Sequence, residues 1–105
     1  MIHVIAMITA QPGQRSKLLE AFKALSPAVR AEEGCIEYSA AIDVQNAQAL
    51  PDSIGPDAFV AIEKWANLAA LRAHSVAPHV QAFEAQAKGL IAIRTIHVLE
   101  PIDAD

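Results

Sequence analysis

Glu63 and Trp65 are the residues of this sequence whose types and spacing first suggest chemistry. They stand two positions apart in FVAIEKWA, residues 59 to 66, where alternate residues of a strand would share a face. The indole, the Glu63 carboxylate and Phe59 should therefore leave the same side of a sheet. A carboxylate on such a face is costly unless it is paired, and burial raises its pKa. The pattern predicts either a structural ion pair at Glu63 or a carboxyl group tuned for proton transfer.

Two histidines follow this strand in predicted helices. His74 comes three residues after Leu71, so both should lean toward the sheet. His79 follows Pro78 at a helix start, where the helix dipole disfavours imidazolium and leaves a ring that accepts a proton. Each could equally be a surface or capping histidine. The interval of five residues is wrong for two ligands on one helical face, so we predict no metal site.

Further polar groups interrupt apolar patterns in the remaining strands. Tyr38 and Arg94 each stand among apolar residues of the same parity. Arg94 could bind an anionic oxygen of a substrate or form a salt bridge in a dimer. His3 and His97 would approach each other if the first and last strands pair, although both also fit exposed strand ends. Cys35, the single cysteine, fits a small buried residue better than a nucleophile.

Apolar periodicity predicts the elements that must position these side chains. Alternation and apolar runs bounded by Gly, Pro and Asn indicate four strands, at residues 2–10, 35–44, 58–66 and 91–100. Helical spacing and capping residues indicate helices at residues 14–33, 67–75 and 78–89. The connection 45–57 is longer than a tight hairpin loop and carries two prolines. We see no internal repeat.

The first helix has the clearest signals. Its predicted buried stripe has spacings of four, three and four residues, at Leu18, Phe22, Leu25 and Val29. Pro27 lies inside this helix and should bend it. Gly34 should supply a left-handed exit position, and Asn67 should cap the helix that follows the third strand.

This order of elements is β-α-β-β-α-β, which predicts a ferredoxin-like α+β fold: a four-stranded antiparallel sheet with both helical segments on one face. Both parities of the first, third and fourth strands are largely apolar, yet helices cover only one face. The other face therefore needs a partner. The simplest partner is a second copy, which would close the two sheets into a barrel-like homodimer.

Composition limits the classes of protein. A chain of 105 residues predicts a single domain, residues 1–105, and its hydrophobic fraction of 53% includes 22 alanines that bury little area each. A net charge of -4 without runs of Lys or Arg disfavours nucleic acid and anionic membranes as partners. A lone cysteine and a strand-like N-terminus without a basic leader favour the cytoplasm.

At the level of motifs the sequence resembles the antibiotic biosynthesis monooxygenase domain family. The resemblance rests on EEGCIEYSAAID at 32–43, FVAIEKWANLAALRAH at 59–74 and APHVQAF at 77–83. It implies a dimeric α+β barrel and a cofactor-free oxygenase. Haem-degrading relatives carry an asparagine on the first strand and a late histidine, where this chain has Met7 and approximately Glu84, so haem degradation is disfavoured.

We therefore predict a homodimeric monooxygenase, without cofactor or metal, that oxidises a hydroxylated aromatic, quinol or polyketide-like molecule with O2. His74 would be the base and Glu63 would orient a histidine, while Trp65, Phe59 and Phe83 would form the cavity wall. Arg94 or Tyr38 would stabilise the oxyanion, and His79 would contact the substrate. Two alternatives stay open: an isomerase or degradative enzyme for a small signalling molecule using the same pocket, and a non-catalytic ligand-binding, stress-response dimer.

Overall fold

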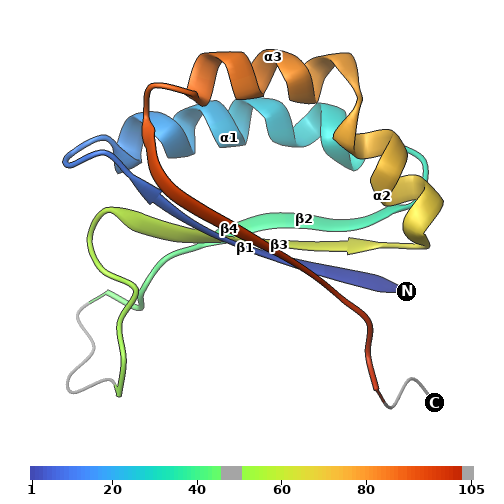
Figure 1. Cartoon of the computed structure of the whole chain (residues 1–105), viewed down its shortest axis with the longest axis horizontal. Helices are drawn as coiled ribbons and strands as arrows, with labels where there is room; N and C mark the ends of the chain where they lie inside the picture. Colours follow the sequence, from blue (N-terminus) through green and yellow to red (C-terminus); the bar gives the residue numbers. More distant parts are fainter. Residues whose placement is uncertain (46–50, 103–105) are drawn as a thin grey trace.

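The chain folds into a four-stranded antiparallel sheet with three helices on one face (Figure 1). The computed structural model describes residues 1–45 and 51–102. In chain order the elements are β1 (Ile2–Ala10), α1 (Arg15–Arg30), β2 (Cys35–Ala41), β3 (Ala58–Trp65), α2 (Leu68–Ser75), α3 (Pro78–Ala87) and β4 (Ile91–Leu99). The sheet order is β2-β3-β1-β4. The ferredoxin-like α+β fold is confirmed, with the second helical segment divided into α2 and α3.

Helix α1 buries the stripe that its spacing predicted. Leu18, Phe22, Leu25 and Val29 are all buried. The helix continues through Pro27 but ends at Arg30, three residues before the predicted end. Beyond Arg30 the chain turns, because the Glu32 amide donates to the Val29 carbonyl and the Cys35 amide donates to the Glu32 carbonyl.

Gly34 joins this turn to α2. It has a φ of 82°, the predicted left-handed conformation. A Cβ at this position would lie 2.6 Å from the Ala70 Cβ, so α2 packs directly against the backbone of the turn. The Asn67 side chain accepts a hydrogen bond of 2.8 Å from the Ala70 amide and caps α2 as expected. The residues of this turn and of α2 are therefore fixed relative to one another.

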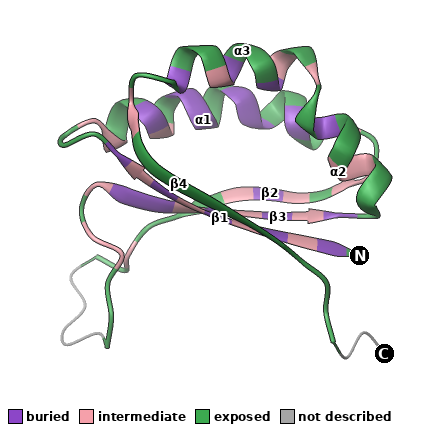
Figure 2. Cartoon of the chain, in the orientation of Figure 1, coloured by how far each residue is buried: buried purple, intermediate pink, exposed green. Residues whose placement is uncertain are grey.

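The hydrophobic core fills the space between the helices and the inner face of the sheet. Its sheet side is formed by alternate residues of β1 and β3, among them Val4, Ala6, Phe59, Ala61 and Trp65. Edge strand β4 is exposed along almost its whole length, as Figure 2 shows. Ile96 and Val98 pair with buried Ala6 and Val4 but are themselves 55% and 50% exposed.

The outer face of the sheet carries apolar side chains that no helix covers in the described part of the chain. Ile5 pairs with Ile62, and Met7 pairs with Val60, across the two central strands. All four lie on the parity opposite to the core residues and are half-buried. The face is thus apolar at its centre, as the sequence pattern indicated.

The long connection between β2 and β3 is anchored at its C-terminal end. The Asp43 carboxylate accepts hydrogen bonds from the Ile54 and Gly55 amides at 3.1 and 3.0 Å. Within the predicted 45–57 connection, residues 46–50 lie outside the described residues. In the two described ranges, no helix has both the length and the apolarity needed to cross a membrane.

Candidate active site

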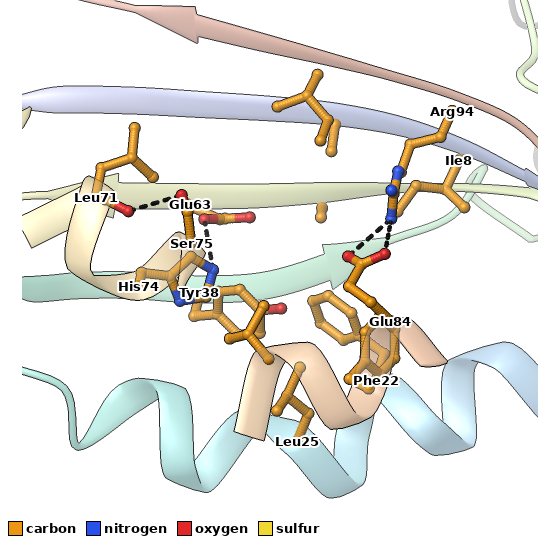
Figure 3. A pocket seen from close by; sticks show the side chains of 15 residues that line it. Ile8, Phe22, Leu25, Tyr38, Glu63, Leu71, His74, Ser75, Glu84 and Arg94 are labelled. Atoms are coloured by element: carbon orange, nitrogen blue, oxygen red, sulfur yellow. Dashed lines mark hydrogen bonds and ion pairs between the residues drawn. The ribbon is translucent and has the colours of Figure 1, made fainter. Parts of the chain in front are cut away.

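A cavity of about 280 Å³ lies between the sheet and the helices. Figure 3 shows side chains of both layers converging on it. Its lining is mostly apolar. Five of the predicted site residues line it, namely Tyr38, Glu63, His74, Phe83 and Arg94. A largely apolar cavity with a few polar groups is the usual form of a small-molecule site.

The other three predicted residues do not line this cavity. Trp65 and Phe59 are fully buried in the core, where each contacts a residue that does line it: the Trp65 indole N–H donates to Glu63, and Phe59 packs edge-on against Phe22. His79 lies at the start of α3, against Glu32. Trp65 and Phe59 thus support the wall from behind instead of forming its surface.

Glu63 is the buried carboxyl group of the cavity. Its side chain shares a face with Trp65, and its Oε1 accepts the indole N–H at 2.9 Å. Burial raises the pKa of Glu63, while the hydrogen bond from Trp65 and the nearby His74 act in the opposite direction. The carboxyl group therefore holds its proton to a higher pH than an exposed glutamate.

His74 presents its two ring nitrogens to two different carboxyl groups. Nδ1 lies 3.0 Å from Glu32 Oε2, and Nε2 lies 3.9 Å from Glu63 Oε1. The ring packs against Trp65, with centroids 4.7 Å apart, and meets Tyr38 at 5.8 Å. Glu63 lines the cavity and Glu32 does not, so Nε2 is the nitrogen on the cavity side.

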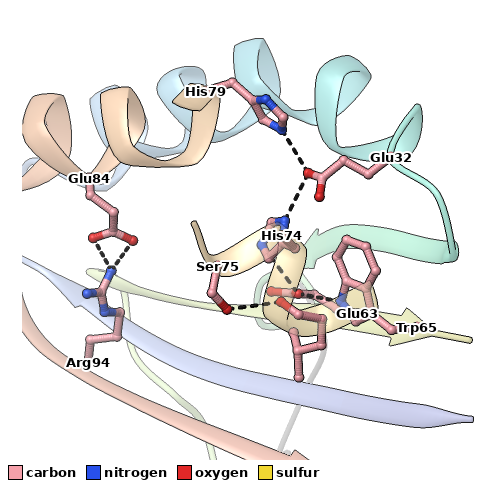
Figure 4. A network of polar contacts seen from close by, with 9 residues as sticks. Glu32, Glu63, Trp65, His74, Ser75, His79, Glu84 and Arg94 are labelled. Atoms are coloured by element: carbon pink, nitrogen blue, oxygen red, sulfur yellow. Dashed lines mark hydrogen bonds and ion pairs between the residues drawn. The ribbon is translucent and has the colours of Figure 1, made fainter. Parts of the chain in front are cut away.

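Glu32 is the site residue that sequence reasoning did not single out. Its Oε2 atom contacts His74 Nδ1 at 3.0 Å and His79 Nε2 at 2.7 Å, as Figure 4 shows. These histidines stand 42 and 47 residues away along the chain. The one signal was the acidic pair before Gly34 in the EEGC turn. Sequence reasoning gave the orienting role to Glu63, whereas the carboxylate within hydrogen-bond distance of His74 is that of Glu32.

Tyr38 is a neutral hydrogen-bonding group of the cavity lining. Its ring stacks on Phe22 with centroids 4.8 Å apart and planes inclined by 10°. Burial raises the pKa of Tyr38 strongly, and the Glu63 and Glu32 carboxylates raise it further. The phenol therefore stays protonated at any working pH and is able to donate a hydrogen bond into the cavity.

Arg94 lies at the other end of the cavity from His74 (Figure 3). Its Nη1 donates to both carboxylate oxygens of Glu84, at 2.9 and 2.8 Å, and so joins β4 to α3. The sequence left open a substrate contact or a salt bridge between subunits. The structure pairs Arg94 within its own chain while keeping it on the cavity surface.

The remaining candidates lie away from the cavity lining. His97 pairs with Ile5 and His3 with Leu99, so the two histidines are diagonal neighbours on the outer face. Cys35 is half-buried, and burial raises the pKa of its thiol. Within residues 1–45 and 51–102, no group of three His, Cys, Asp or Glu side chains is arranged to hold a metal ion.

Comparison with known proteins identifies a family whose sequence pattern this chain matches. The sequence pattern of the family described as antibiotic biosynthesis monooxygenase matches residues 1–86. The chain belongs to this family. That match extends from β1 into α3 and contains every cavity residue discussed above except Arg94 on β4.

Individual proteins and solved structures match this chain almost end to end. The Escherichia coli protein named "Probable quinol monooxygenase YgiN" is 37% identical over 103 residues, which cover 96% of this chain and 98% of that protein. The crystal structure of PA3566 from Pseudomonas aeruginosa has a TM-score of 0.79 at 32% identity and covers 96% of this chain and 93% of its own. Rv0793 from Mycobacterium tuberculosis has a TM-score of 0.79 at 27% identity, with 97% and 95% covered.

Proposed function

We propose that this protein is a monooxygenase that oxidises a hydroxylated aromatic or quinol with O2 and needs no cofactor. The family supports oxygenase chemistry, and the name of its Escherichia coli relative supports a quinol. In the proposed reaction one oxygen atom enters the ring as a hydroxyl group and the other leaves as water. A quinol becomes a hydroxyquinone, so the substrate supplies all the electrons.

The observation that carries this proposal is the placement of His74 at the cavity. Its Nδ1 is engaged by Glu32, while Nε2 points to the cavity side beside Glu63. A buried imidazole of this kind can remove a phenolic proton, which makes the ring electron-rich enough to react with dioxygen. His74 is the proposed base.

Other cavity residues suit the phenolate that such a base creates. Tyr38 would donate to its oxygen, and Arg94 would offer a positive charge if Glu84 shares it with the substrate. Phe83 and Phe22 provide apolar wall. The cavity volume of about 280 Å³ lies just below the range of about 300–1,000 Å³ of ligand pockets, which suits a small aromatic.

We propose further that the active form is a homodimer. The apolar centre of the outer face, around Ile5, Met7, Val60 and Ile62, would meet the same face of a second copy. Strand β4, exposed on both faces, would gain cover in the same assembly. The cytoplasmic location expected from the sequence stays a prediction.

Oxygen consumption with a panel of quinols and anthrones tests the proposed reaction. The unaltered protein should consume O2 above the rate of autoxidation. Reaction under ¹⁸O2 should place one labelled atom in each product molecule, as mass spectrometry detects. His74→Ala should lower kcat by about 10² to 10⁴-fold, the contribution of a positioned general base.

Arg72→Ala is the matched control, because Arg72 is exposed on the same helix α2, does not line the cavity and should leave kcat near that of the unaltered protein. Oxygen uptake without ¹⁸O in the product would indicate an oxidase and contradict the proposal. Uptake that survives His74→Ala would remove His74 from the mechanism. Absence of uptake with every substrate, together with ligand-induced rise of Tm, would favour the binding protein that the sequence left open.

A further inference from the structure

Glu32 has contacts that no role proposed so far explains. It stands in the turn between α1 and β2, outside the cavity lining, with a side chain only 13% exposed. A single oxygen atom, Oε2, lies 3.0 Å from His74 Nδ1 and 2.7 Å from His79 Nε2. Figure 4 shows the carboxylate between the two rings, which come from α2 and α3.

The chemistry of these groups decides which atoms carry protons. An ionised carboxylate only accepts hydrogen bonds, so each histidine nitrogen that contacts Oε2 must donate an N–H. For His74 this places the proton on Nδ1 and leaves the lone pair of the neutral ring on Nε2. Nε2 is the nitrogen on the side of the cavity and Glu63.

Glu63 does not form a competing hydrogen bond with the His74 ring. Its Oε1 lies 3.9 Å from His74 Nε2, beyond hydrogen-bond distance, and already accepts the Trp65 indole N–H at 2.9 Å. The titratable groups around the imidazole are therefore Glu32 from the α1–β2 turn, Glu63 from β3 and Tyr38 from β2, with His79 of α3 beyond Glu32.

His79 holds the carboxylate in place. Its ring is 34% exposed, so it reaches Glu32 from the solvent side while His74 reaches the same oxygen from the buried side. A carboxylate with one donor is free to rotate about its side-chain torsions. A second donor at 2.7 Å, from a different helix, restricts that rotation and fixes the direction from which His74 is held.

We propose that Glu32, anchored by His79, is a positioning residue that fixes His74 in the Nδ1–H tautomer and so leaves Nε2 as the proton acceptor of the cavity. Glu32 acts through His74 and does not touch the substrate. It would also stabilise the imidazolium that forms when His74 takes a proton. The catalytic part of this inference rests on the proposed function, whereas the tautomer does not.

The tautomer is measured directly by long-range ¹H–¹⁵N NMR correlation of the imidazoles in the full-length, ¹⁵N-labelled protein without ligand. At a pH where His74 is neutral, the spectrum should give a protonated Nδ1 and an unprotonated Nε2. Glu32→Gln should abolish this preference, because an amide presents a donor as well as an acceptor. Glu33→Gln is the matched control, since it removes the same charge from the neighbouring exposed position.

A protonated Nε2 in the unaltered protein, or an unchanged tautomer in Glu32→Gln, would overturn the proposal. The first of these measurements needs no variant, so a folding defect in Glu32→Gln does not weaken the test. His79→Gln, whose amide can still donate to Glu32, should preserve the tautomer better than His79→Leu. Equal spectra of these two variants would contradict the anchoring role of His79.

Kinetics test the catalytic consequence separately. With a substrate that supports oxygen uptake, Glu32→Gln should lower kcat by about tenfold or more and leave KM nearly unchanged, because the base is misdirected while the cavity is intact. Glu33→Gln should have the kcat and KM of the unaltered protein.

A kcat unaffected by Glu32→Gln would overturn the positioning role even if the tautomer is as proposed. Absence of uptake in every form would instead contradict the proposed function and leave the NMR result to decide the tautomer.

Discussion

Glu63 is a cavity residue whose pKa is changed by its burial. The strand pattern placed its carboxyl group on the same face as Trp65, and the structure puts the two side chains 2.9 Å apart. The sequence also indicated that such a carboxyl group would be hard to ionise. Its pKa is indeed raised by burial, the largest of the effects acting on it.

The raised pKa makes a prediction about stability. A folded Glu63 holds its proton above the pKa of 4.5 of an unfolded glutamate, so the folded state binds more protons than the unfolded state in that range. Stability is then lost as pH rises from about 4.5 through the pKa of the folded state. Glu63→Gln keeps an acceptor for the Trp65 indole but never ionises. It should raise Tm at pH 8 and leave it unchanged near pH 4.

Thermal unfolding across this range of pH measures the effect. A gain of about 1 kcal/mol would raise Tm by roughly 4–8 °C in a chain of this size. Glu33→Gln, at an exposed position, serves as the control and should follow the unaltered protein at every pH. A Glu63→Gln protein that is less stable at pH 8 would mean that ionised Glu63 is a net stabilising partner, contrary to the argument from burial.

For single residues, the sequence predicted which face of an element each side chain occupies. It predicted less well which other side chains each one contacts. The leaning of His74 toward the sheet follows from its spacing to Leu71, and both residues line the cavity. Trp65 and Phe59 also lie on the expected face, but they are covered by neighbouring side chains. Strand alternation gives the side of a sheet, whereas the depth beneath a surface depends on how the helices pack above it.

At the scale of elements, the junction of the α1–β2 turn with α2 determines the geometry of the site. The turn carries Glu32, and α2 carries His74. The close approach of Ala70 to Gly34 packs α2 against the turn, and a hydrogen bond of 2.8 Å from the Ala66 amide to the Gly34 carbonyl joins the turn to the end of β3, just before α2 begins. Any side chain at position 34 would push α2 away from the turn.

Gly34→Ala should therefore destabilise the protein more than a change of backbone conformation alone. The left-handed conformation costs a residue other than glycine about 1–2 kcal/mol, and overpacking against Ala70 adds about 1–3 kcal/mol. Gly13→Ala is a matched control, because Gly13 has a φ of 77° but no atom within 4 Å of an added Cβ. Urea denaturation of both variants measures the two free energies of unfolding.

An equal decrease in the free energy of unfolding in the two alanine variants would show that the contact with Ala70 relaxes without cost. If instead the larger loss is found for Gly34→Ala, the separation of Glu32 and His74 should also increase. The His74 tautomer in that variant, measured as for Glu32→Gln, should then be mixed.

At the scale of the whole molecule, one monomer leaves apolar surface on both sides of its sheet. Ile5 and Ile62 face each other across the central strands of the outer face, and Ile96 and Val98 of β4, on the inner face, are 55% and 50% exposed. Contiguous exposed apolar surface of this kind usually marks an interface. The single domain over residues 1–105 and the homodimer both stay predictions.

Sedimentation equilibrium tests the homodimer. The unaltered protein should sediment with twice the monomer mass of 11.2 kDa. Ile62→Lys should shift the population toward monomer, because it places a charge at the centre of the proposed interface without a partner. Val76→Lys is the matched control, since Val76 is 66% exposed at the end of α2 in the helical layer. A monomeric unaltered protein, or a dimer indifferent to Ile62→Lys, would contradict this interface.

The sequence by itself determined the order of elements, the buried stripe of α1, the shared face of Glu63 and Trp65, and the family. These are local or periodic properties, because periodicity, capping and turn residues act over a few positions of the chain. Only the tertiary structure decided that Glu32 meets His74 and His79, and that Arg94 pairs with Glu84 beside the cavity. Such contacts join side chains from separate elements, and their distances follow from how helices settle on the sheet, which no spacing along the chain encodes.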